Sequence, residues 1–340
     1  YTARALEAER SRLATPSEVV FAEVGCHGVA EGAALHAAGS DAVLDVTKQK
    51  TANATCAVSM ITGPLRNGAR RGRLAVVGIG PGRSAWRTPE VSRLVAEADV
   101  LVGYGLYIDL LGPAAAGKAR HDYPLGGEED RCRAALELAG EGRSVALVCS
   151  GDGGIYAMGA LVCELLDRPE DAGGVSAAAR RVDVVHAPGV SALQAASARA
   201  GALLGHDFCA ISLSDLLTPR EDIIRRITAA ADGDFVVAFY NPVSRKRRTL
   251  MAEARDILLT RRPTTTPVLL ASNLGRPDER LRLRDLGSID VAEIDMLTTV
   301  LVGSSQSRVV TMGDTGLGVD GRVLYTPRGY ANKREAEAAE

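Results

Sequence analysis

The chain has 340 residues, of which 46% are hydrophobic and 24% charged, as in an ordinary globular protein of two or three domains. Its 40 basic and 42 acidic residues give a net charge of −2, and only 4% of residues are aromatic. This balance excludes a global field that recruits nucleic acid or an anionic membrane. No apolar run approaches the roughly 20 residues of a membrane-spanning helix, and the six cysteines form no C-x-x-C pair. We therefore expect a cytoplasmic protein with buried thiols and no metal site.

The sequence of residues 1–65 predicts a small α/β segment. Strands are expected at 19–24 and 42–46, with a helix at 28–38 that Gly39 ends. Residues 66–73 are rich in Gly and Arg and lack periodicity, which indicates a linker.

From residue 74 onward, apolar strands alternate with helices. Strands are expected at 74–78, 100–102, 144–149 and 182–185, and helices at 89–98, 130–139 and 156–166. This alternation is typical of a largely parallel sheet covered on both faces. A second unit follows, with helices at 191–199 and 249–259 and strands at 235–240, 267–271 and 299–302. We predict two α/β domains, 74–187 and 188–330, and a frayed tail at 331–340.

The first candidate ligand loop is V-V-G-I-G-P-G, residues 76–82, between a strand and a helix. Its spacing is G-x-G-x-G, which is not a dinucleotide fingerprint. Pro81 lacks the N–H that a pyrophosphate would use, and no acidic residue ends the strand at 100–102. These departures exclude a nicotinamide-dependent oxidoreductase.

Three further loops follow in order. In C-S-G-D-G-G-I-Y, residues 149–156, Asp152 either accepts hydrogen bonds from a ligand or caps the next helix. In A-P-G-V-S-A, residues 187–192, Ser191 is the expected helix N-cap. In F-Y-N-P-V-S, residues 239–244, the Asn-Pro pair must turn the chain and leaves the Asn241 amide available to a ligand.

In this order the four motifs resemble those of the tetrapyrrole methyltransferases. Within that family the resemblance is to enzymes that methylate C-17 of precorrin-3B, through G-H-D-F-C-A-I-S-L-S-D-L-L-T-P (205–219) and D-M-L-T-T-V-L-V-G-S-S-Q-S-R (295–308). It implies an α/β, two-domain class III methyltransferase fold with S-adenosylmethionine in the interdomain cleft, and a homodimer. Carried over by motif, the donor pocket comprises Pro81, Gly151, Asp152, Ile155, Ser191, Ala192, Asn241, Ser272, Asn273, Thr298 and Thr299. Arg83 and Gly153 depart from the family's usual Asp and Pro, and bear on donor affinity.

The resemblance implies methyl transfer to C-17 with ring contraction to precorrin-4, in cobalamin biosynthesis. Methyl transfer depends on positioning, whereas contraction needs a general acid or base. The acid–base candidates are Tyr104, Asp109, His121 and Glu128, although ordinary exposed roles are an alternative for each. The polycarboxylate substrate needs cations, and the candidates are Arg245, Lys246, Arg247, Arg248, Lys118, Arg220 and Arg308, with a solvated helix face as the alternative.

Residues 24–35 and 48–58 resemble the C-terminal domain of the cobalt-precorrin-5A hydrolases. Only the later part of that domain matches, so we do not expect complete hydrolase activity. His27, Glu31, Lys48 and Lys50 could line a tetrapyrrole site, with structural roles as the alternative. Such a fusion makes other corrin-pathway enzymes candidate partners.

Two other functions remain open for the whole chain. One is methylation of cobalt-precorrin-3 in the anaerobic route, which the sequence does not separate from the metal-free reaction. The other is a tetrapyrrole-binding or carrier protein without catalysis, which would not bind the methyl donor.

Overall fold

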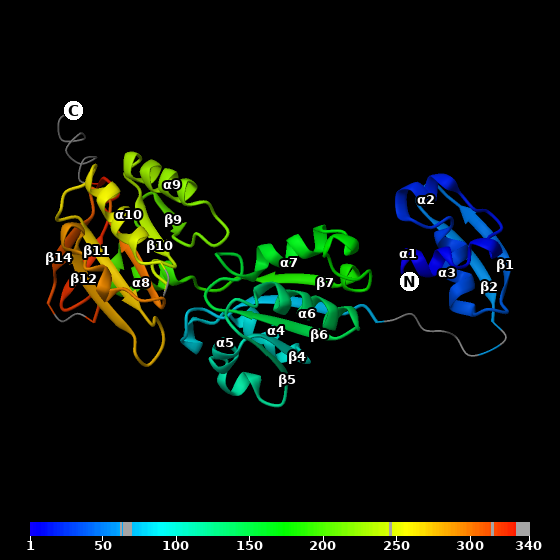
Figure 1. Ribbon diagram of the computed structural model, residues 1–340. Helices are drawn as coiled ribbons and strands as arrows, with labels where there is room; N and C mark the ends of the chain where they lie inside the picture. The colour runs from blue at the N-terminus through cyan, green and yellow to red at the C-terminus, as the bar shows by residue number, and fades with distance from the viewer. Residues whose placement is uncertain (62, 64–69, 245–246, 314–315, 331–340) are drawn as a thin grey trace.

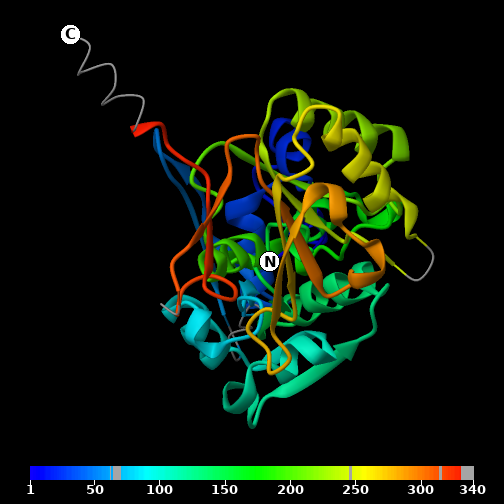
Figure 2. The same cartoon turned by 90° about the vertical axis from the view of Figure 1, so that its left-hand side faces the viewer.

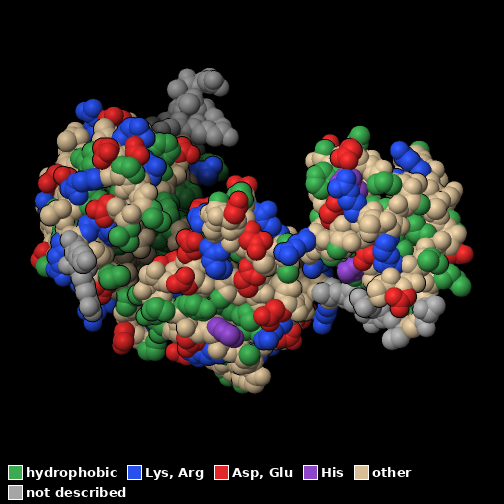
Figure 3. Space-filling view, turned by 45° about the vertical axis from the view of Figure 1, so that its right-hand side comes forward, with side chains coloured by type: hydrophobic (Ala, Val, Ile, Leu, Met, Phe, Trp, Pro, Cys, Tyr) green, Lys and Arg blue, Asp and Glu red, His purple; other side chains and the backbone are tan. Residues whose placement is uncertain are grey.

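The computed structural model describes residues 1–340 except 62, 64–69, 245–246, 314–315 and 331–340. The expected tail and the candidates Arg245 and Lys246 lie outside the described residues. Figure 1 shows three parts in chain order: an N-terminal unit in blue, a first lobe in cyan to green, and a second lobe in green to red. In Figure 3, acidic and basic side chains are interspersed over the visible face, in keeping with the small net charge. Across the described part of the chain, no helix is long and apolar enough to span a membrane.

The N-terminal unit contains short helices and a two-stranded antiparallel hairpin, on which α3 packs, with α1 packed on α3. Its elements are α1 (Ala3–Glu7), η1 (Arg10–Arg12), α2 (Glu18–Val24), α3 (Val29–Ala38), β1 (Val43–Lys50) and β2 (Thr55–Met60). The predicted strand at 19–24 is wrong, because these residues form α2. The side chain of Ser17 accepts the Val20 N–H at its start, and Gly25 ends it at a φ of 73°. The predicted α3 and β1 are confirmed.

Two buried polar residues hold the N-terminal unit together. The Glu31 carboxylate accepts the main-chain N–H groups of Thr15 and Lys48 at 2.9 and 2.8 Å. His27 is buried against Glu7, with Nδ1 2.9 Å from the Glu7 carboxylate, and its ring stacks on Phe21. Both side chains therefore have internal structural partners.

The first lobe is built on a five-stranded, fully parallel sheet of order β5-β4-β6-β3-β7. Its strands are β3 (Arg73–Gly78), β4 (Val100–Tyr104), β5 (Ala119–Tyr123), β6 (Ser144–Cys149) and β7 (Asp183–Ala187). Its helices are η2 (Ser84–Trp86), α4 (Pro89–Glu97), α5 (Gly105–Asp109), η3 (Gly112–Ala115), α6 (Glu128–Gly140), α7 (Met158–Asp167), η4 (Glu170–Ala172) and η5 (Ala179–Arg181). Along β3, Leu74 and Val76 enter one core cluster, and Ala75 and Val77 enter the other. The predicted parallel sheet with two covered faces is confirmed.

The second lobe has a mixed sheet of order β12-β11-β13-β10-β9, in which β9 and β10 pair in parallel and the other described pairs are antiparallel. Its strands are β8 (Gly201–Ala202), β9 (Phe208–Ser212), β10 (Val236–Tyr240), β11 (Pro267–Ser272), β12 (Arg280–Asp285), β13 (Thr298–Val302), β14 (Arg308–Thr311) and β15 (Arg322–Tyr325). Its helices are α8 (Ala192–Ala200), α9 (Arg220–Asp232), α10 (Thr249–Leu259), η6 (Leu286–Ser288) and η7 (Val291–Glu293). Helices α9 and α10 cover one face of the sheet, as Figure 2 shows, and α8 packs on the other.

Candidate functional site

Three glycine-bearing loops meet where the first lobe joins the second. The main chains of Gly80 and Gly151 exchange two hydrogen bonds, of 3.1 and 2.9 Å. A Cβ on Gly189 would overlap the carbonyl oxygens of Gly151 and Gly78, and a Cβ on Gly78 would lie 2.7 Å from the Gly151 oxygen. Only glycine allows main chains to approach this closely, so the motifs create a side-chain-free floor.

Asp152 ties the second loop to the third. Its carboxylate accepts the N–H groups of Gly154 and Gly189, at 2.8 and 3.0 Å. The alternative role as a helix cap is wrong, because α7 begins at Met158 with Ala157 as its N-cap residue. The Asp152 side chain therefore fixes the spacing of two loops.

The third loop is held by the end of β10. Ser191 is the N-cap of α8, as predicted, and its N–H donates to the Gln194 side chain at 2.9 Å. The Tyr240 hydroxyl lies 2.6 Å from the Ser191 Oγ and accepts the Leu193 N–H at 3.0 Å. Burial raises the pKa of Tyr240, so this phenol stays neutral and serves as a fixed bridge.

The fourth loop is stabilised by an arginine. Asn241 adopts a φ of 49°, and its amide donates to the Ser212 Oγ at 3.1 Å. Arg247 donates to the Asn241 carbonyl and to the Asp215 carboxylate, both at 2.9 Å. The hydrogen bond from Arg247 holds the pKa of Asp215 below its usual value. Arg247 is therefore engaged in shaping the Asn-Pro turn.

A cleft between the lobes gathers residues from all four loops. It is lined by Pro81, Tyr107, Ser150, Gly151, Asp152, Ile155, Tyr156, Ser191, Ala192, Tyr240, Asn241, Asn273, Leu274, Arg276, Met296, Leu297, Thr298 and Thr299. We call it the donor cleft, after the methyl donor that these loops are expected from their sequence to bind. Of the residues expected to bind a donor, Ser272 alone is missing from this lining. It is buried behind the wall, with its Oγ 2.7 Å from the Thr298 Oγ1.

Tyr107 and Arg276 are two of the lining residues that the sequence motifs did not assign to the donor pocket. Tyr107 lies in the short helix after β4, and its burial raises the pKa of its phenol. Arg276 reaches across from the second lobe, and its Nε donates to the Pro81 carbonyl at 3.2 Å. The sequence G-Y-G-L-Y-I-D at residues 103–109, which follows a predicted strand, could have indicated Tyr107, whereas no motif marks Arg276.

Among the described residues, none of the four acid–base candidates lines the donor cleft. Asp109 pairs with Arg120 at 2.7 Å, and Glu128 pairs with Arg131 at 3.0 Å. His121 lies on the edge strand β5. The ring of Tyr104 makes an edge contact with that of the lining residue Tyr107, with the ring centroids 5.2 Å apart.

A neighbouring cavity of about 630 Å³ adjoins the donor cleft, and we call it the side cavity. It is lined by Leu125, Ser214, Asp215, Leu216, Asn241, Val243, Ser244, Arg247 and Met296. Asn241 and Met296 line both spaces, which places the two side by side.

The other described cation candidates lie outside both linings. Lys118 donates to the carbonyls of Ala96 and Ala98, both at 2.7 Å, near the end of α4. Arg220 pairs with Glu253 at 2.5 Å. Arg248 is the N-cap residue of α10, and Arg308 lies on the exposed β14.

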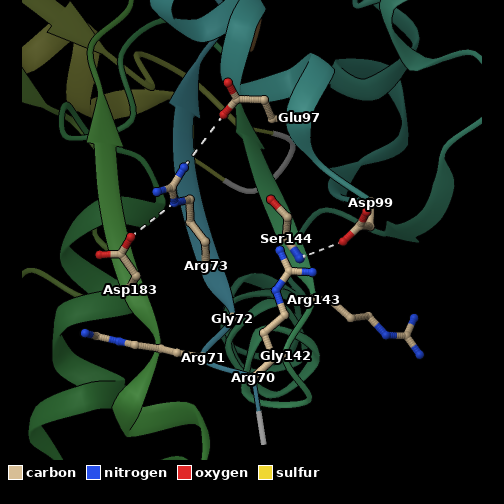
Figure 4. Close-up of a pocket in the computed structure, with 10 residues that line it drawn as sticks. All are labelled: Arg70, Arg71, Gly72, Arg73, Glu97, Asp99, Gly142, Arg143, Ser144 and Asp183. Atoms are coloured by element: carbon tan, nitrogen blue, oxygen red, sulfur yellow. Dashed lines mark hydrogen bonds and ion pairs between the residues drawn. The ribbon is translucent and has the colours of Figure 1, made fainter.

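A third cavity, of about 480 Å³, lies at the amino ends of β3 and β6 (Figure 4). Arg73 in its wall is flanked by Glu97 at 3.7 Å and Asp183 at 3.1 Å, and Asp99 accepts the Ser144 N–H. The wall charges thus largely compensate one another. The donor cleft lies at the opposite, carboxyl edge of the sheet, where open α/β sheets bind ligands.

This fold and cleft define a methyltransferase class. The chain belongs to the tetrapyrrole (corrin/porphyrin) methylases, whose sequence model matches residues 73–290. It is thus an S-adenosylmethionine-dependent enzyme that methylates carbon of a tetrapyrrole. The model described as the cobalamin synthesis G C-terminus matches residues 1–59.

Several relatives resemble the chain closely. The precorrin-3B C(17)-methyltransferase of Sinorhizobium sp is 42% identical over 262 residues, covering 76% of this chain and 98% of the relative. The probable cobalt-factor III C(17)-methyltransferase of Salmonella typhimurium is 42% identical over 257 residues, covering 76% and 99%. The crystal structure of the methyltransferase CobJ superposes with a TM-score of 0.66 at 38% identity, covering 75% of this chain and all of that one.

Proposed function

We propose that the chain transfers a methyl group from S-adenosylmethionine to C-17 of precorrin-3B, coupled to contraction of the macrocycle. The observation that carries this proposal is the 42% identity to a precorrin-3B C(17)-methyltransferase over 98% of that relative's length. The donor cleft supports it, because loops far apart in the sequence bring the expected donor-binding residues together.

The residues of the donor cleft fit the chemistry of the methyl donor. Its adenine and thioether portions suit apolar side chains, and its ribose and amino-acid portions suit hydroxyl, amide and main-chain groups. The wall offers both kinds through Ile155, Leu274 and Leu297, and through Ser150, Asn273 and Thr298. When bound, the donor supplies a methyl group already activated on a sulfonium.

The chain's own contribution to methyl transfer is then positioning. The glycine floor lets the main chain lie against a ligand, and Asp152 and Tyr240 hold the flanking loops through hydrogen bonds. Holding two reactants in near-attack geometry can supply about 7–11 kcal/mol of the barrier. A rigid cleft therefore accounts for transfer without an acid or base in contact with the methyl group.

The tetrapyrrole is proposed to lie in the side cavity. Leu125, Leu216, Val243 and Met296 give it an apolar wall suited to a macrocycle, and Arg247 lies at its edge. Arg247, the described residue of the basic run that lines this cavity, is proposed to meet a substrate carboxylate. A homodimer is the proposed assembly.

A second candidate substrate is cobalt-factor III, favoured by the equal identity to the relative that carries that name. The deciding experiment incubates the purified protein and methyl donor with either substrate and analyses the products by mass spectrometry. We expect gain of one methyl group on the metal-free substrate and none on the cobalt-bearing one. The reverse outcome would assign the cobalt-bearing substrate. Methylation of neither, with donor binding intact, would refute both.

A further inference from the structure

Arg276 lies at the junction of the two lobes, in the turn that follows β11. Its N–H donates to the Asn273 carbonyl at 3.0 Å, and Asn273 and Gly275 have φ values of 52° and 71°. A Cβ on Gly275 would lie 2.7 Å from the Arg83 nitrogen, so the first lobe packs directly on this turn. Close packing thus fixes the backbone from which Arg276 projects.

The guanidinium of Arg276 is largely uncommitted. One of its five N–H donors, on Nε, bonds to the Pro81 carbonyl. The remaining four have no hydrogen bond or ion pair with any residue that the structure describes. Because Arg276 and Pro81 both line the donor cleft, this single bond holds the guanidinium at the cleft wall.

The charges of the wall indicate what Arg276 is suited to bind. Among the described lining residues, Asp152 supplies the one carboxylate and Arg276 the one guanidinium. Both oxygens of Asp152 already accept main-chain N–H groups. Arg276 therefore presents free donors in a fork whose planar geometry matches a carboxylate.

We infer that Arg276 binds the α-carboxylate of the methyl donor, which rests on the proposed function of the donor cleft. Substrate carboxylates are the other source of such a group. They would be expected nearer the side cavity, whose described lining contains Arg247 and not Arg276. Because Arg276 lines the donor cleft and not the side cavity, the methyl donor is the favoured source of the carboxylate.

The test is isothermal titration of the full-length protein with S-adenosylmethionine and with its decarboxylated analogue, which lacks that carboxylate alone. We expect Arg276→Gln to weaken S-adenosylmethionine binding on the order of tenfold to a hundredfold, as for a lost charged hydrogen bond. Its affinity for the decarboxylated analogue should match that of the wild type. Arg276→Lys should recover part of the loss, because it keeps the charge without the fork. Arg225→Gln, an exposed arginine on α9, is the matched control.

Equal weakening of both ligands by Arg276→Gln would show a purely structural role and overturn the inference. So would unchanged donor affinity with a raised KM for the tetrapyrrole. If Arg276→Gln does not fold, Arg276→Lys provides the test. The inference then requires that Arg276→Lys binds S-adenosylmethionine more weakly than the wild type does, but binds the decarboxylated analogue equally well. Failure of the wild type to bind S-adenosylmethionine would instead refute the proposed function, which keeps the two failures distinct.

Discussion

Asp152 joins two loops, because its carboxylate accepts the N–H of Gly189, which is 37 positions further along the chain. Asp152→Ala leaves the Gly154 and Gly189 N–H groups without their partner, at a cost of about 1–3 kcal/mol for each group kept from water. We expect donor binding to fall below detection in isothermal titration and the melting temperature to drop. The control is Asp171→Ala, at an exposed position in η4. Unchanged donor affinity would contradict the role of this loop.

The buried Glu31 makes the stability of the N-terminal unit depend on pH. Burial alone raises its pKa, but the N–H groups of Lys48 and Thr15 stabilise the carboxylate more and leave the pKa below its usual value. Its contribution to stability is therefore complete above the unfolded pKa of about 4.3 and is lost as pH falls through the lower folded pKa.

The change Glu31→Gln places an amide NH₂ where an acceptor is needed. We expect it to destabilise the unit at neutral pH by about 1–3 kcal/mol and to flatten its stability profile in the acid range. Calorimetry between neutral and acid pH measures both effects. Glu23→Gln, at an exposed position on α2, is the control, and an unaltered acid profile in Glu31→Gln would count against this account.

At the scale of elements, η2 of the first lobe docks on the second lobe through Trp86. The guanidinium groups of Arg83 and Arg199 each lie 5.6 Å from the indole, and Arg199 is held by Glu279 at 2.6 Å. Trp86 also packs against the second-lobe core cluster that contains Leu193. This contact fixes the two walls of the donor cleft relative to each other.

Removing one cation should loosen that contact. We expect Arg199→Ala to cost about 1 kcal/mol and to shift tryptophan emission to longer wavelength as water reaches the indole. Trp86 is the only tryptophan in the chain, so the emission reports on this contact alone. Arg225→Ala should leave the spectrum unchanged, and an unshifted spectrum in Arg199→Ala would refute the contact.

For the whole molecule, the N-terminal unit is expected to be independent of methyl transfer. Within the described residues, the hydrogen bonds and ion pairs of residues 2–61 stay inside the N-terminal unit. About three quarters of the chain spans nearly all of the 42% identical relatives. A variant lacking residues 1–69 should bind S-adenosylmethionine as tightly as the full chain and should lose one calorimetric transition. Loss of donor binding in this variant would show that the unit supports the cleft.

The sequence by itself determined the elements whose signals are local. Apolar runs placed β3, β6 and β11 within a residue of their ends, and the glycine motifs marked the loops of the donor cleft. The strand expected at 19–24 failed because its apolar residues suit either structure, and the capping by Ser17 and Gly25 decided for a helix.

Only the tertiary structure decided which charged side chains face the cleft. Arg276 has no motif of its own and reaches Pro81 from 195 positions away, whereas Lys118 was a candidate and instead bonds the end of α4. No sequence pattern shows which way a single charged side chain points, because its partner is set by how the two lobes pack. The donor cleft was thus predictable loop by loop, while its charged wall depends on the packing of one lobe against the other.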